Sequence, residues 1–245
     1  MDTLNILKQL EASNGGYISM EGSYFKGINP TIGTGINSPT ATTFSATSCM
    51  LSIQNPLGIW PGSASYHQRP ATPLGEGSTF MVLDYFKFLI TAADTTATSW
   101  QWAITVDTTN RYSSGGTTPS QFCTNPLVSS IPSYAPKASI HVGAVTLTAA
   151  SANVIQIGRG SAKKVTTAPL LLVDDEIVFS FGRGDSLTGF TKGGGTSGTN
   201  PALYRQHAGV VCVPPGCTFM MHSWFPAISA AFSFEFELGW EEIQL

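Results

Sequence analysis

The sequence is poor in charge. Only 11% of its 245 residues are Asp, Glu, Lys or Arg, whereas a typical soluble domain has about 25%. The formal net charge is −3, and Lys163–Lys164 is the only adjacent basic pair. This balance excludes recruitment of nucleic acid or of an anionic membrane by bulk electrostatics. The first fifty residues carry only Lys8 and Lys26 as cations, so we expect no basic arm that neutralises nucleic-acid phosphates.

Long apolar runs and cysteines are also scarce. No window approaches the roughly 18 apolar residues of a membrane span, and the start M-D-T-L-N-I-L-K-Q-L-E has no apolar signal-peptide core. We therefore expect a soluble chain made in a cytosol, with no membrane span. The four cysteines, at positions 49, 123, 212 and 217, are too few for a disulfide scaffold of this length. We expect free thiols, most of them buried.

What the sequence has instead is Ser, Thr, Asn, 25 Gly and 15 Pro, a composition that favours strands joined by many turns. The clearest pattern is Ala231–Trp240, which reads A-F-S-F-E-F-E-L-G-W. Its aromatic residues and Leu238 fall on every second position. This period predicts a strand with one apolar face and one acidic face, because successive side chains of a strand point to opposite sides. The apolar face requires a second layer to bury it.

Similar patterns predict further strands, at Thr42–Gln54, Thr79–Ala93, Ser99–Asp107, Lys137–Thr148, Glu176–Phe181 and Val210–Phe225. Thr79–Ala93 is a near-continuous apolar run, so it is either a strand buried on both faces or a buried helix. Its β-branched and aromatic content favours the strand. A bulge at Gly143 accounts for a slip in the alternation, and Asn153–Ile157 is expected to pair back on the same segment. Tyr17–Thr40 and Asn110–Pro136 lack regular alternation and are expected to be irregular.

These elements predict an all-β protein, an antiparallel two-sheet sandwich with long loops. We expect residues 42–245 to form the sandwich and residues 1–41 to form an N-terminal arm. The arm begins with a short helix over residues 2–13, which Asp2 caps and Asn14-Gly15-Gly16 ends. The helix either packs on a neighbouring subunit or is a frayed end.

Catalytic and metal-binding patterns find little support. The four histidines, at positions 67, 141, 207 and 222, lie far apart without acids or cysteines paired to them in the sequence. We expect no enzyme, no metal and no cofactor. Cys212 and Cys217 flank a turn and are a zinc half-site, a disulfide, or two small core residues, of which the last is favoured. Asp174-Asp175-Glu176 is either a Ca²⁺ ligand set or a solvated turn, and the turn is favoured.

Arg183-Gly184-Asp185 is the sharpest short motif, and it lies in a glycine-rich segment that runs from Gly182 to Asn200. A guanidinium and a carboxylate on either side of a glycine form a compact two-charge probe. The tripeptide resembles the integrin-binding motif. The alternative is an incidental Arg and Asp in a glycine-rich loop. Trp60 and Tyr66, in a proline-rich loop, are candidates for a contact surface or for burial under that loop.

The layout resembles that of viral jelly-roll capsid proteins. The resemblance is carried by the strand count, the charge-poor Ser/Thr/Gly/Pro composition and the order of the closing segments. A strand at Glu176–Phe181 precedes the Arg-Gly-Asp loop, a strand pair follows around Val-Pro-Pro-Gly, and the aromatic strand closes the chain. In that family the last four strands alternate between two sheets, and the loop that matches Gly182–Gly209 often faces outward and contacts receptors. The chain departs from many such proteins in having no Arg/Lys-rich arm.

The resemblance implies a structural capsid protein of a non-enveloped icosahedral virus, found in the virion and made in the host cytoplasm. Its expected partners are copies of itself, other capsid proteins and a host cell-surface receptor that binds the 182–209 loop. Low charge fits this function because every charge that an interface desolvates needs a partner. The alternatives are a trimeric receptor- or glycan-binding jelly-roll module, such as a fibre head or lectin, and a pore-forming β toxin.

Overall fold

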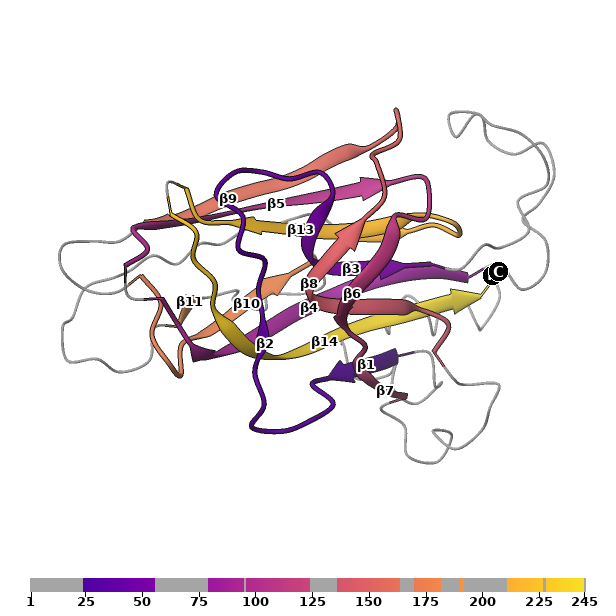
Figure 1. The fold of residues 1–245 in the computed structure, drawn as a ribbon. Coiled ribbons are helices and arrows are strands. Elements are labelled where there is room, and N and C mark those ends of the chain that lie inside the picture. Colours follow the sequence, from indigo (N-terminus) through magenta and orange to yellow (C-terminus); the bar gives the residue numbers. More distant parts are fainter. Residues whose placement is uncertain are drawn as a thin grey trace.

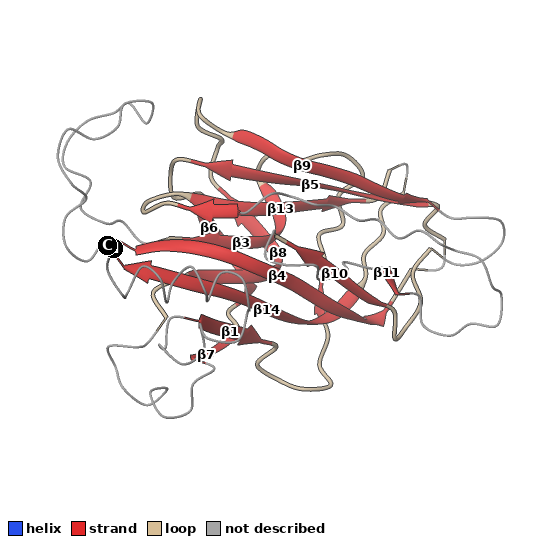
Figure 2. Ribbon diagram, turned by 180° about the vertical axis from the view of Figure 1, so that it is seen from behind, coloured by secondary structure: helices blue, strands red, loops and turns tan. Residues whose placement is uncertain are grey.

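The structure is a computed structural model that describes residues 24–55, 79–94, 96–123, 136–163, 170–181, 190–191, 211–226 and 228–244. These residues contain fourteen strands and no helix. The strands form two antiparallel sheets that pack face to face (Figures 1 and 2). The predicted all-β, two-sheet class is thereby confirmed, whereas the predicted helix over residues 2–13 lies outside the described residues.

We call the sheet of eight strands sheet A and the sheet of six strands sheet B. Sheet A runs in the order β11 (Phe190–Thr191), β10 (Glu176–Ser180), β4 (Thr79–Ala92), β14 (Ser233–Gln244), β1 (Tyr24–Ile28) and β7 (Ser120–Cys123); β12 (Val211–Val213) also pairs with β4, and β2 (Ile36–Asn37) with β14. Sheet B runs in the order β6 (Tyr112–Thr117), β8 (Ser139–Leu147), β3 (Ser48–Gln54), β13 (Thr218–Trp224), β5 (Ser99–Asp107) and β9 (Ile155–Lys163). The last four long strands, β9, β10, β13 and β14, therefore alternate between the two sheets.

The predicted aromatic strand is β14, and its apolar face is buried as expected. The side chains at positions 232, 234, 236, 238 and 240 are each at most 4% exposed. The main partner of β14 in sheet A is β4, with Leu238 opposite Phe86 and Phe236 opposite Phe88. The register shifts between Gly239 and Trp240, which marks a β-bulge at that point.

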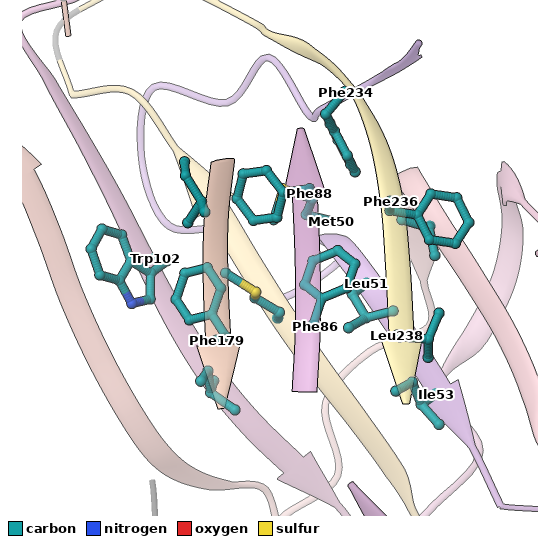
Figure 3. Close-up of a cluster of buried hydrophobic side chains, with 14 of the residues drawn as sticks. Met50, Leu51, Ile53, Phe86, Phe88, Trp102, Phe179, Phe234, Phe236 and Leu238 are labelled. Carbon is teal, nitrogen blue, oxygen red and sulfur yellow. The ribbon is translucent and has the colours of Figure 1, made fainter. Parts of the chain in front are cut away.

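Part of the second layer over the aromatic segment Ala231–Trp240 and over β4 comes from β5 of sheet B, as the alternation of Ser99–Asp107 predicts. Phe232 meets Trp100 edge to face at 5.6 Å between ring centroids, and Phe88 meets the same indole at 6.0 Å. Phe179 of β10, a strand of sheet A, packs against Trp102 at 5.6 Å. Figure 3 shows Phe88, Trp102 and Phe179 within the cluster of buried hydrophobic side chains. Edge-to-face pairs at these separations add stability beyond the area that they bury.

β4 is a strand, as predicted, but it is not buried on both faces. Phe86, Phe88 and Ile90 are fully buried in the core, whereas Lys87 is only partly covered and Leu89 is 37% exposed on the outer face of sheet A. The apolar run hides this difference, because Leu89 and its neighbours look like core residues in the sequence. An antiparallel sheet can leave one face in water, and here sheet A does so.

Three segments differ from the sequence prediction, because pairing with distant strands decides their structure. Residues 17–40 are predicted to be irregular, but β1 is a strand of sheet A between β14 and β7, within the predicted arm. Asn110–Pro136 is predicted to be a loop, but β6 pairs with β8 and β7 with β1. The predicted pairing of Lys137–Thr148 with Asn153–Ile157 does not form, because β8 pairs with β3 and β6 while β9 pairs with β5.

The predicted bulge at Gly143 is confirmed. Gly143 has a φ of +106°, and the β3–β8 register steps from Cys49–Val145 to Leu51–Val142 around it. A Cβ at Gly143 would lie 3.1 Å from the carbonyl oxygen of Asn37. Glycine therefore serves both a positive φ and a close approach of another backbone segment.

The outer face of sheet B is partly covered by a second, smaller apolar cluster. Its buried members come from β3, β8 and β13, and they are Cys49, Val145, Leu147 and Met220, with Tyr112 of β6 packed against them. Sheet B therefore has apolar clusters on both of its faces.

Candidate functional site

The motif that the sequence singles out, Arg183-Gly184-Asp185, lies outside the described residues, as do Trp60 and Tyr66. Receptor binding by this loop stays a prediction. The described residues contain two sites with ion pairs. One is buried beside the outer face of sheet B, and the other covers the outer face of sheet A.

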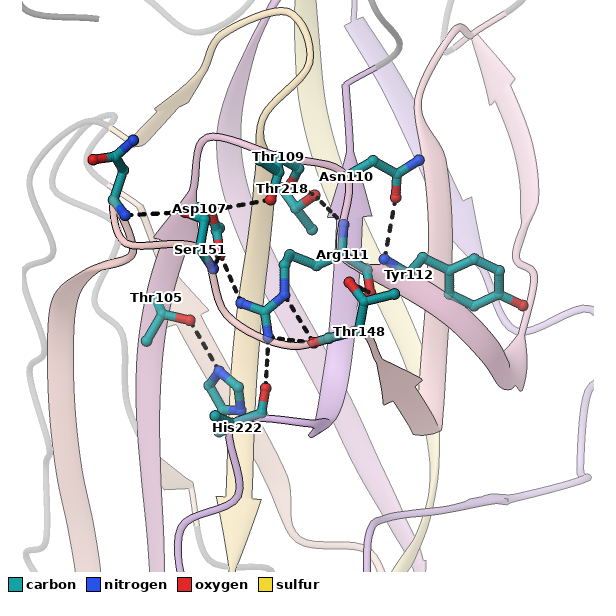
Figure 4. Close-up of polar contacts among 12 residues, drawn as sticks. Thr105, Asp107, Thr109, Asn110, Arg111, Tyr112, Thr148, Ser151, Thr218 and His222 are labelled. Carbon is teal, nitrogen blue, oxygen red and sulfur yellow. Dashed lines mark hydrogen bonds and ion pairs between the residues drawn. The ribbon is translucent and has the colours of Figure 1, made fainter. Parts of the chain in front are cut away.

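The first site is built on an ion pair between Asp107 and Arg111, at the turn from β5 into β6. Arg111 Nη1 lies 2.7 Å from Asp107 Oδ2, and the two side chains are only 2% and 0% exposed. The Arg111 guanidinium also donates from Nη2 to the carbonyl of Ala46 and from Nη2 and Nε to that of Thr148, at 2.7 to 3.0 Å. Figure 4 shows the guanidinium at the centre of this network.

Asp107 completes the network on the other side. Its carboxylate accepts hydrogen bonds from the backbone NH of Ser151 at 3.0 Å, from the Ser151 hydroxyl, and from the Thr109 hydroxyl at 3.2 Å. Burial raises the pKa of Asp107, but the bonds from Ser151 and Arg111 outweigh burial and leave the pKa below its ordinary value. The pair is therefore charged, and it ties β5, the 44–47 segment and the 148–151 segment together. This is a structural role.

The sequence offers a signal for this pair that motif searching misses. Between Asp94 and Lys137, the only charged residues are Asp107 and Arg111, four positions apart and of opposite sign. Charges this isolated in an uncharged segment favour pairing with each other, because a lone buried charge is costly. The contacts of Arg111 with the carbonyls of Ala46 and Thr148 depend on the tertiary fold.

A recess of about 200 Å³ opens beside this ion pair, on the outer face of sheet B. Its apolar lining comes from Phe44, Ala46, Ala150 and Val154. Its polar lining comes from Thr105, Arg111, Gln156 and His222. Phe44 is 46% exposed and Val154 is 38% exposed, so both stand at the mouth of the recess.

His222 lies at the floor of the recess as a neutral ring. Its Nδ1 lies 2.8 Å from the carbonyl of Ser48, so Nδ1 carries the proton and Nε2 accepts the hydroxyl hydrogen of Thr105 at 2.9 Å. Burial lowers the pKa of His222, and the charge of Arg111 lowers it further against the effect of backbone hydrogen bonds. Phe44 covers the ring at 4.9 Å between centroids. With both nitrogens engaged by a carbonyl and a hydroxyl, the ring is held as part of an apolar recess.

The second site is an ion network on the outer face of sheet A. Glu237 of β14 lies 2.7 Å from Lys26 Nζ and 3.2 Å from Lys87 Nζ, and it accepts a hydrogen bond from the Tyr85 hydroxyl. Burial raises the pKa of Glu237, but these three partners outweigh burial and lower the pKa to about 2. Glu237, one of the two acids that the sequence predicts on this face of the strand, is therefore neutralised by two lysines from adjacent strands.

The remaining candidates have structural explanations in the described chain. Cys217 is buried and Cys212 is exposed, and both are free thiols, so the prediction of two core residues holds for Cys217 only. Burial raises the pKa of Cys217 to about 11. Asp174-Asp175-Glu176 forms a turn that leads into β10, in which Asp174 is exposed as expected. Asp175 departs from the expected solvated turn, because it is fully buried and accepts the NH of Leu172 at 2.8 Å. Asp174 has a φ of 69°, as a tight turn requires.

The two described histidines lie in different surroundings. His141 stacks on Tyr112 at 3.6 Å between ring centroids, away from the floor of the recess where His222 lies. Among the described residues no group of three or more His, Cys, Asp or Glu side chains could hold a metal ion. The same part of the chain has no helix that is long and apolar enough to cross a membrane.

No protein-family model matches the chain, and no significant match was found among curated proteins or among solved structures.

Proposed function

We propose that the sandwich is of the jelly-roll type. Eight strands carry this proposal: β1, β3, β4, β5, β9, β10, β13 and β14 in chain order. If these eight strands are numbered 1 to 8 along the chain, neighbouring strands in sheet A have the order 1-8-3-6, which is β1, β14, β4 and β10. Neighbouring strands in sheet B have the order 2-7-4-5, which is β3, β13, β5 and β9. In this order chain-adjacent strands mostly lie in different sheets, as two interleaved Greek keys require. The β6–β8 segment is an insertion between the fourth and fifth strands.

On this fold, the function we propose is that of a structural coat protein of a non-enveloped icosahedral virus, which self-assembles into a shell. The strand order is the observation that carries the proposal. The surface chemistry supports it, because the Lys26–Glu237–Lys87 network pairs these three charges on the outer face of sheet A. Such a face associates with a neighbour at a lower desolvation cost than unpaired charges impose.

The proposal extends to the 182–209 loop, which follows β10 where that strand ends at Ser180. We propose that Arg183 and Asp185 contact a host receptor. The change Asp185→Glu keeps the charge but lengthens the side chain by one methylene, so it moves the carboxylate out of register with a receptor-bound metal. Attachment of particles to cells should fall. Unchanged attachment would refute the receptor proposal and leave the shell proposal standing.

The chain has no basic arm in its first fifty residues. We propose that another protein handles the genome, or that this chain is one of several coat proteins that share a shell. The proposed location is the virion, after synthesis in the host cytoplasm.

The shell proposal is tested by expressing the chain alone. Negative-stain electron microscopy should show closed, symmetric particles, and light scattering coupled to size-exclusion chromatography should show their mass. Small trimers would instead support a receptor- or glycan-binding module. A strictly monomeric chain across a range of salt and pH would refute self-assembly.

A further inference from the structure

Ile32 is a large apolar side chain held out in water on a rigid loop. It is 88% exposed and lies between β1 and β2, in a loop that projects beyond the sheets in Figure 1. The Asn29 side-chain amide donates to the carbonyls of Thr31 and Thr34, both at 2.8 Å. The NH of Gly33 donates to Glu235 Oε1 at 2.6 Å.

Single exposed apolar residues are ordinary on protein surfaces, but this one is preorganised. The hydrogen bonds on both sides of Ile32 fix the turn before any contact forms, so docking the side chain has a small entropic cost. An exposed apolar side chain of this kind, here called the knob, forms an intermolecular contact when another molecule has a surface recess of matching size.

The recess on the outer face of sheet B is large enough for one branched aliphatic side chain. Its volume is about 200 Å³, and an apolar cavity of roughly 150 Å³ already accommodates a benzene molecule. One branched aliphatic side chain therefore fits. Phe44 and Val154 stand exposed at the mouth, where they would close around the stem of such a side chain.

The charges beside the knob and beside the recess are complementary. Glu235 lies at the base of the Ile32 loop, bonded to Gly33. Arg159 of β9 is exposed on the same outer face as the recess, where Ala103 separates it from His222 in the sheet B register. Opposite charges at two surfaces favour their approach and fix their orientation.

We infer that Ile32 of one copy of this chain docks into the Phe44/Val154 recess of another copy. The loop and the recess lie on different sheets, so the contact joins two different patches. Such a head-to-tail contact repeats around an axis and closes a ring when the rotation closes. The inference rests on the proposed function, in which copies of the chain assemble, and it names one contact of that assembly.

The first test changes the knob and the recess separately. Ile32→Ala should raise the protein concentration needed for assembly by roughly 10- to 100-fold, the loss expected when a buried isoleucine side chain is removed from a contact. Ile32→Leu is the matched control, and it should assemble as the unchanged chain does. Ala150→Phe should block the recess and inhibit assembly, whereas Ala149→Phe, at an adjacent exposed position that does not line the recess, should not.

The second test detects the contact directly. A Cys212→Ser chain that carries both Ile32→Cys and Ala150→Cys should form a ladder of disulfide-linked multimers on a non-reducing gel, and neither single cysteine variant should. Tryptophan fluorescence confirms that each variant is folded. Suppose that the unchanged chain forms particles. If Ile32→Ala then assembles equally well and no ladder appears, the docking inference is overturned and the coat-protein proposal stands. A chain that stays monomeric in every condition overturns both.

Discussion

Replacing Arg111 by methionine tests whether the buried ion pair holds the outer layer of sheet B in place. The change leaves the Asp107 carboxylate, which is fully buried, without its cation, and it leaves the carbonyls of Ala46 and Thr148 without their guanidinium donor. Removing one partner of a buried ion pair costs about 3–5 kcal/mol. The expected loss in the free energy of unfolding is of that order, because methionine fills the volume but donates no hydrogen bond.

The assay is urea unfolding of unassembled subunits, followed by tryptophan fluorescence. At an m-value of about 3 kcal/mol per molar, the loss should shift the midpoint by about 1–2 M. Arg111→Lys keeps the charge but not the planar set of donors, so its loss should be intermediate. In a double-mutant cycle, Asp107→Asn combined with Arg111→Met should cost less than the sum of the single changes. A loss below about 1 kcal/mol for Arg111→Met, or strict additivity, would refute the reasoning.

Three further predictions concern the outer face of sheet A, the core and the thiols. The folded-state pKa of Glu237 is about 2, below the ordinary 4.5, so Glu237 contributes stability above pH 4.5 that is lost as the pH falls towards 2. Glu237→Gln should cost about 1 kcal/mol at pH 7 and flatten that pH dependence in urea titrations; an unchanged pH profile would contradict the network. Gly160→Ala places a methyl group against the Trp102 ring, so it should cost about 1–3 kcal/mol by thermal unfolding, while Ser161→Ala, on the other face of β9, should be neutral. Ellman's reagent should titrate one thiol per native chain, that of Cys212, and four after unfolding; rapid reaction of Cys217 would contradict its burial.

The proposed Ile32 contact lies beside the Arg111 ion pair, so a change at either site could affect assembly. Measuring stability and assembly together separates the two effects. Arg111→Met weakens the segments that shape the recess and should lower both stability and assembly. Ile32→Ala changes an exposed side chain and should lower assembly alone, with an unchanged urea midpoint. Assembly that survives Arg111→Met with a loosened recess would argue that the recess is not the docking point.

The alternation of single strands could be predicted from the sequence, but their partners could not. The β14 pattern indicates a buried aromatic face, and Phe232, Phe234 and Trp240 are buried as it requires. The Tyr112–Thr117 segment has no alternating apolar residues, yet it is a strand, because β8 offers it a backbone edge. Backbone hydrogen bonding is independent of side-chain type, so composition carries no signal for strands of this kind.

Of the candidate sites, one could be predicted from the sequence and one could not. The isolated pair Asp107 and Arg111 is visible in the sequence as the only two charges between Asp94 and Lys137. The recess is not visible there, because Phe44, Val154 and His222 come from three segments that lie far apart in the sequence. Only the packing of loops over sheet B brings these segments together.

The sequence by itself determined that the described part of this chain is built of strands, that β14 has one buried face, and that Gly143 sits in a bulge. These features depend on the local order of apolar and polar residues and on the conformations that glycine allows. Only the tertiary structure decided the order of strands in the two sheets, the pairing of Glu237 with two lysines and the recess beside Arg111. These features depend on contacts between residues far apart in the chain, and the free energy of such contacts is set by the fold as a whole.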